Sequence, residues 1–93
     1  MGGEVTPEQR LRTPGELTAA LRSLRADVAA GRLEQYFDPD ALLGTEKTLG
    51  EIPLEGPWDD YLELFFRDPR TGERYQLTAE TYHGQGGAFE RLG

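Results

Sequence analysis

The sequence predicts an α+β domain in which one long N-terminal helix packs on a small, mostly antiparallel sheet built around a central hairpin. Two patterns support this architecture. Residues 14–30 repeat apolar side chains at helical spacing, and residues 61–67 and 73–78 are typical of two strands joined by a turn. A chain of 93 residues forms one small domain. We expect residues 13–93 to make that domain and residues 1–12 to form a flexible arm or a short helical turn.

The helix is predicted to begin at a capping motif. Thr13 can accept a hydrogen bond from the backbone N–H of Glu16, whose side chain can reach back, and Pro14 occupies the first helical position. Gly31 is placed to end the helix. The apolar positions form one stripe that can cover a face of the sheet: Leu17, Ala20, Leu21, Leu24 and Val28.

The segments between the helix and the hairpin give weaker signals. Residues 32–37 hold Leu, Tyr and Phe and are expected to form a short strand or an extended link. Residues 38–44 begin with Asp-Pro and end in Gly, which is typical of a single helical turn. In residues 45–54 glycine and proline interrupt the apolar positions, so an edge strand or an irregular segment is expected. Residues 55–60 are expected to be a loop that carries Trp58.

The central hairpin is predicted from its turn and its alternation. Residues 68–72, Asp-Pro-Arg-Thr-Gly, place Asp at the first turn position, Pro next, and Gly where a positive φ closes the loop. After the hairpin, glycines in residues 79–87 indicate a loop, and residues 88–92 can return as a last strand. The first strand divides its side chains between two faces, with Leu62, Leu64 and Phe66 on one and Tyr61, Glu63, Phe65 and Arg67 on the other.

The formal net charge of −7 is concentrated in residues 38–63, because the rest of the chain balances nine acidic residues with nine arginines. This distribution argues against nucleic-acid binding, which requires clustered Lys and Arg. It allows a basic protein partner or a cation, and the alternative is an acidic surface that only keeps the domain soluble. The segment holds one base, Lys47, and eight acidic residues: Asp38, Asp40, Glu46, Glu51, Glu55, Asp59, Asp60 and Glu63.

Composition excludes several classes of protein. The chain has no cysteine, which rules out a disulfide, a thiolate nucleophile and a cysteine metal site. It has no apolar run of about 18 residues, the length of a membrane span. Its start lacks the basic and apolar segments of a signal peptide. We therefore expect a cytoplasmic protein that does not bind membranes. The absence of Asn and the predominance of Arg over Lys predict a bacterial source with a high-GC genome, or a thermophile.

No cofactor, metal or catalytic residue is expected. Ser23, the single serine, lies inside the predicted helix, which excludes a serine hydrolase. The Asp-x-Asp pair of residues 38–40 resembles the start of a calcium loop, but the glycine and glutamate that such a loop needs are absent. His83 lies in a glycine-rich loop with Gly84 and Gly86, which we treat as a candidate functional loop. There it could perform acid–base chemistry, or it could only hold the loop by bonding a carbonyl.

The last part of the chain carries an ordered pattern. Residues 65–78 (Phe-Phe-Arg-Asp-Pro-Arg-Thr-Gly-Glu-Arg-Tyr-Gln-Leu-Thr) are followed by His-Gly-x-Gly at His83 and by Arg-Leu in residues 91–92. This pattern resembles the C-terminal part of the family-27 immunity proteins of bacterial polymorphic-toxin systems, and the similarity spans residues 58–92. The resemblance implies a protein that binds and neutralises a cognate toxin and is not an enzyme.

The charge and the resemblance together predict a small protein-binding module that neutralises a basic, nuclease-like toxin through an acidic surface. A nuclease presents a basic cleft, which an acidic face would attract and block. The alternatives are a structural or regulatory domain in which Trp58 only fills the core, and an enzyme that uses His83 with a carboxylate such as Asp68 or Glu80. The expected contact residues combine aromatic anchors with charges: Trp58, Asp59, Asp60, Tyr61 and Glu63.

Overall fold

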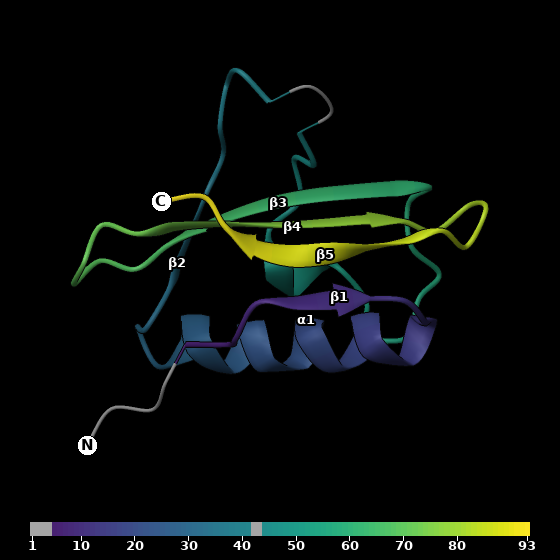
Figure 1. The fold of residues 1–93 in the computed structure, drawn as a ribbon, viewed down its shortest axis with the longest axis horizontal. Coiled ribbons are helices and arrows are strands. Elements are labelled where there is room, and N and C mark those ends of the chain that lie inside the picture. Colours follow the sequence, from purple (N-terminus) through teal and green to yellow (C-terminus); the bar gives the residue numbers. More distant parts are fainter. Residues whose placement is uncertain (1–4, 42–43) are drawn as a thin grey trace.

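The computed structural model describes residues 5–41 and 44–93. Those residues form one α-helix, one 3-10 turn and a five-stranded antiparallel sheet with strand order β1-β5-β4-β3-β2. The helix lies along one face of the sheet (Figure 1). The predicted α+β architecture is therefore confirmed, although the helix is only 16 residues long. In chain order the elements are β1 (Gln9–Leu11), α1 (Pro14–Ala29), β2 (Glu34–Tyr36), η1 (Leu49–Glu51), β3 (Tyr61–Arg67), β4 (Arg74–Glu80) and β5 (Gly86–Arg91).

The predicted capping motif starts α1. Thr13 Oγ1 accepts the backbone N–H of Glu16 at 3.1 Å, and Glu16 Oε1 accepts the backbone N–H of Thr13 at 3.1 Å. The same carboxylate oxygen accepts the backbone N–H of Arg12 at 2.7 Å, which fixes the chain that enters the helix. The helix ends at Ala29, close to the predicted end, and is followed by Gly31 with a φ of 77°.

One hydrophobic core lies between α1 and the sheet. Because directly opposite residues of paired strands share a face, Leu64 of β3, Leu77 of β4 and Phe89 of β5 form a row across the sheet. Phe89 meets Phe66 edge to face with ring centroids 6.4 Å apart, and it stacks on Tyr75 at 5.5 Å. The predicted inner face of β3 is thus confirmed. The helix buries four of the five residues of its predicted stripe in this core, namely Leu17, Ala20, Leu21 and Leu24, and the fifth, Val28, is partly buried.

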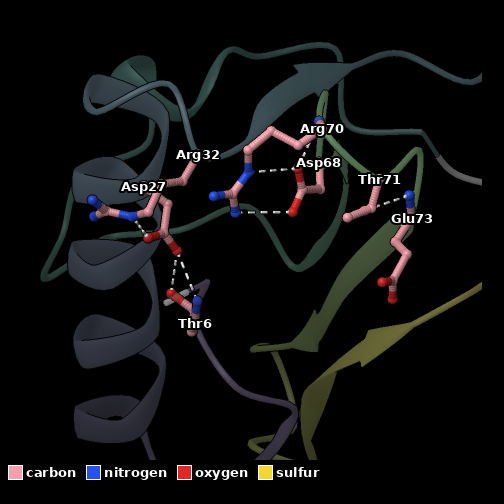
Figure 2. A network of polar contacts seen from close by, with 7 residues as sticks. All are labelled: Thr6, Asp27, Arg32, Asp68, Arg70, Thr71 and Glu73. Atoms are coloured by element: carbon pink, nitrogen blue, oxygen red, sulfur yellow. Dashed lines mark hydrogen bonds and ion pairs between the residues drawn. The ribbon is translucent and has the colours of Figure 1, made fainter. Parts of the chain in front are cut away.

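The β3–β4 hairpin closes with the predicted turn. Asp68 N donates to Glu73 O at 2.8 Å and Gly72 N donates to Asp68 O at 2.8 Å, and Gly72 has a φ of 77°. The Asp68 carboxylate accepts the backbone N–H of Arg70 at 2.8 Å and its guanidinium at 3.3 Å (Figure 2). The guanidinium and then the backbone N–H of Arg70 hold the pKa of Asp68 below its ordinary value, although burial opposes them.

Residues 1–12 were predicted to form a flexible arm or a helical turn. This prediction is wrong for residues 5–12, and residues 1–4 lie outside the described residues. The arm contains strand β1, which pairs with the free edge of β5. Before β1, Thr6 N and Oγ1 donate to Asp27 Oδ2 at 2.9 and 2.6 Å (Figure 2). Asp27 Oδ1 accepts Arg32 Nε at 2.8 Å, so this carboxylate joins the arm to the end of α1. The arm is therefore part of the domain.

For the residues that follow α1, the structure decides between a strand and an extended link and tests the predicted helical turn. Strand β2 confirms a short strand within residues 32–37, and it pairs with the end of β3 nearest the hairpin turn. In residues 38–44, where a helical turn was expected, Asp38 O accepts the N–H of Ala41 at 3.1 Å and forms a turn. The rest of that prediction includes residues 42–43, which lie outside the described residues.

Residues 45–54 form no strand, so the irregular alternative is confirmed. They contain the 3-10 turn η1, which begins after Thr48. Glu51 Oε1 accepts the N–H and the hydroxyl of Thr48, both at 2.9 Å, and this reciprocal contact stabilises the turn. Gly50 and Pro53 explain the outcome, because neither residue favours a regular strand.

Strands β4 and β5 extend into residues 79–87, which were predicted as a loop, so that prediction is wrong at both ends of the range. A Cβ atom at Gly86 would collide with the carbonyl oxygen of Leu11, and one at Gly87 would collide with that of Thr78. These glycines therefore allow neighbouring backbones to approach closely inside the sheet. The predicted last strand is confirmed as β5.

Candidate functional site

The described part of residues 37–60, which joins β2 to β3, carries seven of the 17 acidic residues of the chain, and we call it the acidic connection. It extends on the side of the sheet opposite α1 and then passes the sheet towards the helix (Figure 1). Thr45 N donates to Glu63 O of β3 at 3.1 Å. Further along, Thr18 Oγ1 of α1 donates to Leu54 O at 2.7 Å. The acidic connection is therefore fixed against both layers of the domain.

The acidic connection holds seven of the eight acidic residues of the central segment, and six of these are exposed. Lys47 Nζ contacts Asp59 Oδ2 at 3.0 Å, with both side chains about half exposed. The backbone N–H and then the hydroxyl of Thr48 lower the pKa of Glu51, so that carboxylate stays charged in mild acid. Among the described residues no ion pair neutralises the other four exposed carboxylates: Asp40, Glu46, Glu55 and Asp60.

Trp58 lies between the acidic connection and the core. Its indole N–H donates to Pro53 O at 2.7 Å, and its ring packs partly buried against the core residues. Gly56 has a φ of 80°, and a Cβ atom there would lie 3.5 Å from the Trp58 ring. The backbone thus folds closely around the indole, which contributes to the core and also keeps an accessible edge.

Four of the predicted contact residues come together at the start of β3. Thr81, just after β4, fixes this corner, because its N–H donates to Asp60 O at 2.9 Å and its hydroxyl donates to Asp59 O at 2.7 Å. The side chain of Asp59 is 51% exposed, and Tyr61 is 36% exposed. These residues form a corner with two exposed acids and the accessible Tyr61 ring, whereas the ring of Trp58, which precedes them in the sequence, packs partly buried against the core.

Glu63 is separated from that corner, because it is only 8% exposed. Its Oε1 accepts Gly44 N at 2.7 Å and its Oε2 accepts Gln76 Nε2 at 3.0 Å. Its backbone N–H donates to Thr45 Oγ1 at 2.8 Å. Strand alternation correctly places Glu63 on the face opposite α1, but the acidic connection covers it there. Its carboxylate joins the connection to the sheet and is not presented to a partner.

The loop between β4 and β5 places His83 against a carboxylate. Glu80 Oε1 lies 2.8 Å from His83 Nδ1, and the Glu80 carboxylate accepts the backbone N–H groups of His83 at 2.9 Å and Gln85 at 3.2 Å. Burial raises the pKa of Glu80, but these N–H groups and the imidazole together hold it below its ordinary value. Gly84 and Gly86 have φ values of 71° and 76°, which let the loop fold around Glu80.

The chemistry open to this loop is limited by its exposure. A neutral imidazole that donates from Nδ1 to Glu80 leaves Nε2 as an acceptor, and 67% of the His83 side chain is exposed. Tyr82 packs edge-on against the imidazole with ring centroids 4.7 Å apart. Water around the ring weakens the electrostatic effects on which active sites depend. Within residues 5–41 and 44–93, no group of three or more His, Cys, Asp or Glu side chains is arranged to hold a metal ion.

A small hollow beside Trp58 was not predicted from the sequence, and we call it the Trp58 cavity. Its volume is about 80 Å³. It lies where the start of α1, the β4–β5 loop and the segment before β3 meet at one end of the domain (Figure 1). No local pattern could reveal it, because its lining comes from distant parts of the chain. Leu11, Leu17, Ala79 and Trp58 form its apolar wall, and Arg12, Thr13, Pro14, Glu80, Thr81, Gly84 and Gly86 complete the lining.

The chain matches no protein-family model, no curated protein and no solved structure. The resemblance of residues 58–92 to immunity proteins therefore stays a prediction. In the described residues no helix is long and apolar enough to cross a membrane. The function must be inferred from the residues of this chain and their geometry.

Proposed function

We propose that this chain is a small cytoplasmic module that captures a basic protein through its acidic connection. The observation that supports the proposal most strongly is that seven acidic residues belong to one connection beside β3, and that only one base, Lys47, lies among them. At the end of the connection, Trp58 and Tyr61 offer accessible aromatic surface next to Asp59 and Asp60. Aromatic rings beside charges are typical anchors of protein interfaces.

The two kinds of residue would contribute differently to binding. Exposed acids attract a basic partner and raise the association rate, but they add little affinity individually because water and salt screen them. Burial of the Trp58 and Tyr61 rings would supply most of the affinity. Removing the charges should therefore slow binding and reduce its salt dependence, whereas removing the rings should speed dissociation.

The resemblance to immunity proteins supports a specific version of this proposal, in which the partner is a nuclease-like toxin. A nuclease needs a basic cleft for its substrate. An acidic module seated in that cleft would block the substrate and neutralise the toxin at once. The alternative is a structural or regulatory domain, in which the same acids keep the surface soluble.

A pull-down with the proteins encoded beside this one tests the proposal. The tagged chain should retain a basic protein in about 50 mM salt and release most of it in about 0.5 M salt, where charges are screened over a few ångströms. Asp59→Lys/Asp60→Lys should abolish retention. Glu8→Lys/Glu90→Lys is the matched control, because it changes the charge equally at exposed positions near the β1–β5 edge. The proposal is refuted if both double variants retain the partner as the wild-type chain does, and if retention is the same at both salt concentrations.

An enzyme that uses His83 is the second candidate, and one contact favours it. His83 Nδ1 lies 2.8 Å from Glu80 Oε1, an arrangement that can orient an imidazole as a general base. In cells that express the captured toxin, His83→Ala separates the two functions. If the chain is a binding module, capture of the toxin is enough for protection, so the variant should still capture the toxin and still protect the cell. An enzyme predicts that the variant still captures the toxin and no longer protects.

A further inference from the structure

A groove lies at the end of the sheet where β2 runs beside the β3–β4 hairpin (Figure 1), and we call it the arginine groove. Its volume is about 540 Å³, and small-molecule sites typically measure about 300–1,000 Å³. Arg67 alternates with the buried Phe66, so the groove belongs to the sheet face opposite α1. Its lining comes from three neighbouring strands: Glu34, Gln35 and Tyr36 of β2, Arg67 of β3 and Arg74 of β4.

The arginine groove holds two like charges side by side. Arg67 stands directly opposite Arg74, a position in which two side chains begin about 5 Å apart and like charges destabilise the sheet. Glu34 stands opposite Arg67 on the other side, and its Oε1 lies 2.9 Å from Arg67 Nη2. The Arg74 guanidinium makes no ion pair with any of the described residues. One positive charge is therefore left uncompensated in the groove, although the whole chain has a formal net charge of −7.

The lining favours a carboxylate attached to an apolar body. A carboxylate carries the one negative charge that the groove lacks, whereas the carboxylate of Glu34 would repel the second charge of a phosphate dianion. A planar carboxylate also matches a guanidinium through two parallel hydrogen bonds. Tyr36 supplies an apolar wall, and its ring is held in place because it packs against Phe65 with centroids 5.6 Å apart.

We propose that the arginine groove binds a small organic acid, whose carboxylate is held by Arg74 and Arg67 and whose apolar body lies against Tyr36. Glu34 lowers the affinity of the site, because it competes with the ligand for Arg67. The groove and the acidic corner at the start of β3 lie at opposite ends of this seven-residue strand, about 20 Å apart. The site is therefore separate from the surface that captures a basic protein, and its role does not depend on that capture.

Benzoate tests the inference, with benzamide as a neutral ligand of the same shape. In an NMR titration of the isotope-labelled chain, benzoate should shift the amide signals of Tyr36, Arg67 and Arg74 saturably in the millimolar range, as expected for so small a ligand. Benzamide should bind at least about 10-fold more weakly, because it lacks the charge that strengthens hydrogen bonds to a guanidinium. Inorganic phosphate should also bind more weakly than benzoate. Equal affinities for benzoate and benzamide, tighter binding of phosphate, or no saturable shift with benzoate would overturn the inference.

Four variants at exposed positions assign the binding to the groove, and circular dichroism checks that each of them folds. Arg74→Gln should weaken benzoate at least about 10-fold, whereas Arg10→Gln makes the same charge change on β1 and should have no effect. Glu34→Gln releases Arg67 for the ligand and should tighten benzoate about 3-fold to 10-fold, and Glu90→Gln on β5 is its matched control. If Arg74→Gln binds benzoate as the wild-type chain does, or if Glu34→Gln weakens it, the proposed site is refuted.

Discussion

Replacing Asp27 by alanine should destabilise the domain by about 3 kcal/mol, because hydrogen bonds to a buried charged group contribute about 1.5–3 kcal/mol each. Asp27 is 2% exposed and accepts two hydrogen bonds from Thr6, at 2.9 and 2.6 Å. It also accepts Arg32 Nε at 2.8 Å, but the Arg32 side chain is 23% exposed and can turn to water. Most of the loss should therefore come from the backbone N–H and the hydroxyl of Thr6, which the variant leaves without an acceptor.

Urea denaturation followed by circular dichroism measures this loss. Thr6→Val is the partial control, since it keeps the backbone N–H and removes only the hydroxyl, and it should cost about 1–2 kcal/mol. In the double variant the two losses should not add, because both act on one contact. Breaking a buried pair typically lowers the free energy of unfolding by about 3–5 kcal/mol. If Asp27→Ala lowers it by less than about 1 kcal/mol, this carboxylate does not hold the N-terminal arm to the helix. Fully additive losses would refute that role as well.

Three further results are expected. Leu21→Ala should lower the free energy of unfolding by about 2–5 kcal/mol because Leu21 is fully buried, whereas Arg22→Ala should cost less than about 0.5 kcal/mol; equal denaturant midpoints would contradict the assigned helix face. Gly87→Ala should cost at least about 2 kcal/mol, since the added Cβ forces β4 and β5 apart; an unchanged thermal midpoint would contradict that close approach. The pKa of Asp68 is lowered on folding, so its charge stabilises the fold above its ordinary value of 3.8 and this contribution disappears as the pH falls below that value. The stability difference between the wild-type protein and Asp68→Asn should shrink as the pH falls below 3.8, and a difference that grows in acid would contradict the sign.

The helix and the hairpin were predictable because their signals are local. Thr13 and Glu16 are three residues apart and close one capping box, and the turn of residues 68–72 is determined by the order of its own five residues. Strand alternation then places Leu64 and Phe66 on one face, and both side chains are buried in the core. These contacts form within short stretches of the chain, so sequence spacing is enough to locate them.

The features that were missed depend on contacts between distant residues. Strand β1 has three residues and is stabilised by β5, which lies far away in the sequence. Glu63 was expected at the surface because strand alternation places it on the face opposite α1, and that assignment is correct. Only the folded chain shows that Gly44 and Thr45 cover it there. The Trp58 cavity combines four segments, and none of them carries a pattern that indicates a hollow. Alternation can assign a side chain to a face, but it cannot tell what covers that face.

The footprint of the captured basic protein on the isotope-labelled chain, measured by NMR, tests the central claim most directly. The amide signals of Asp40, Glu46 and Asp60, together with the indole N–H signal of Trp58, should shift or broaden when the partner is added. The signals of Glu8 and Glu90, near the opposite edge of the sheet, should stay unchanged. A footprint confined to β1 and β5, with the acidic connection and Trp58 unaffected, would contradict the claim that this acidic corner is the binding site.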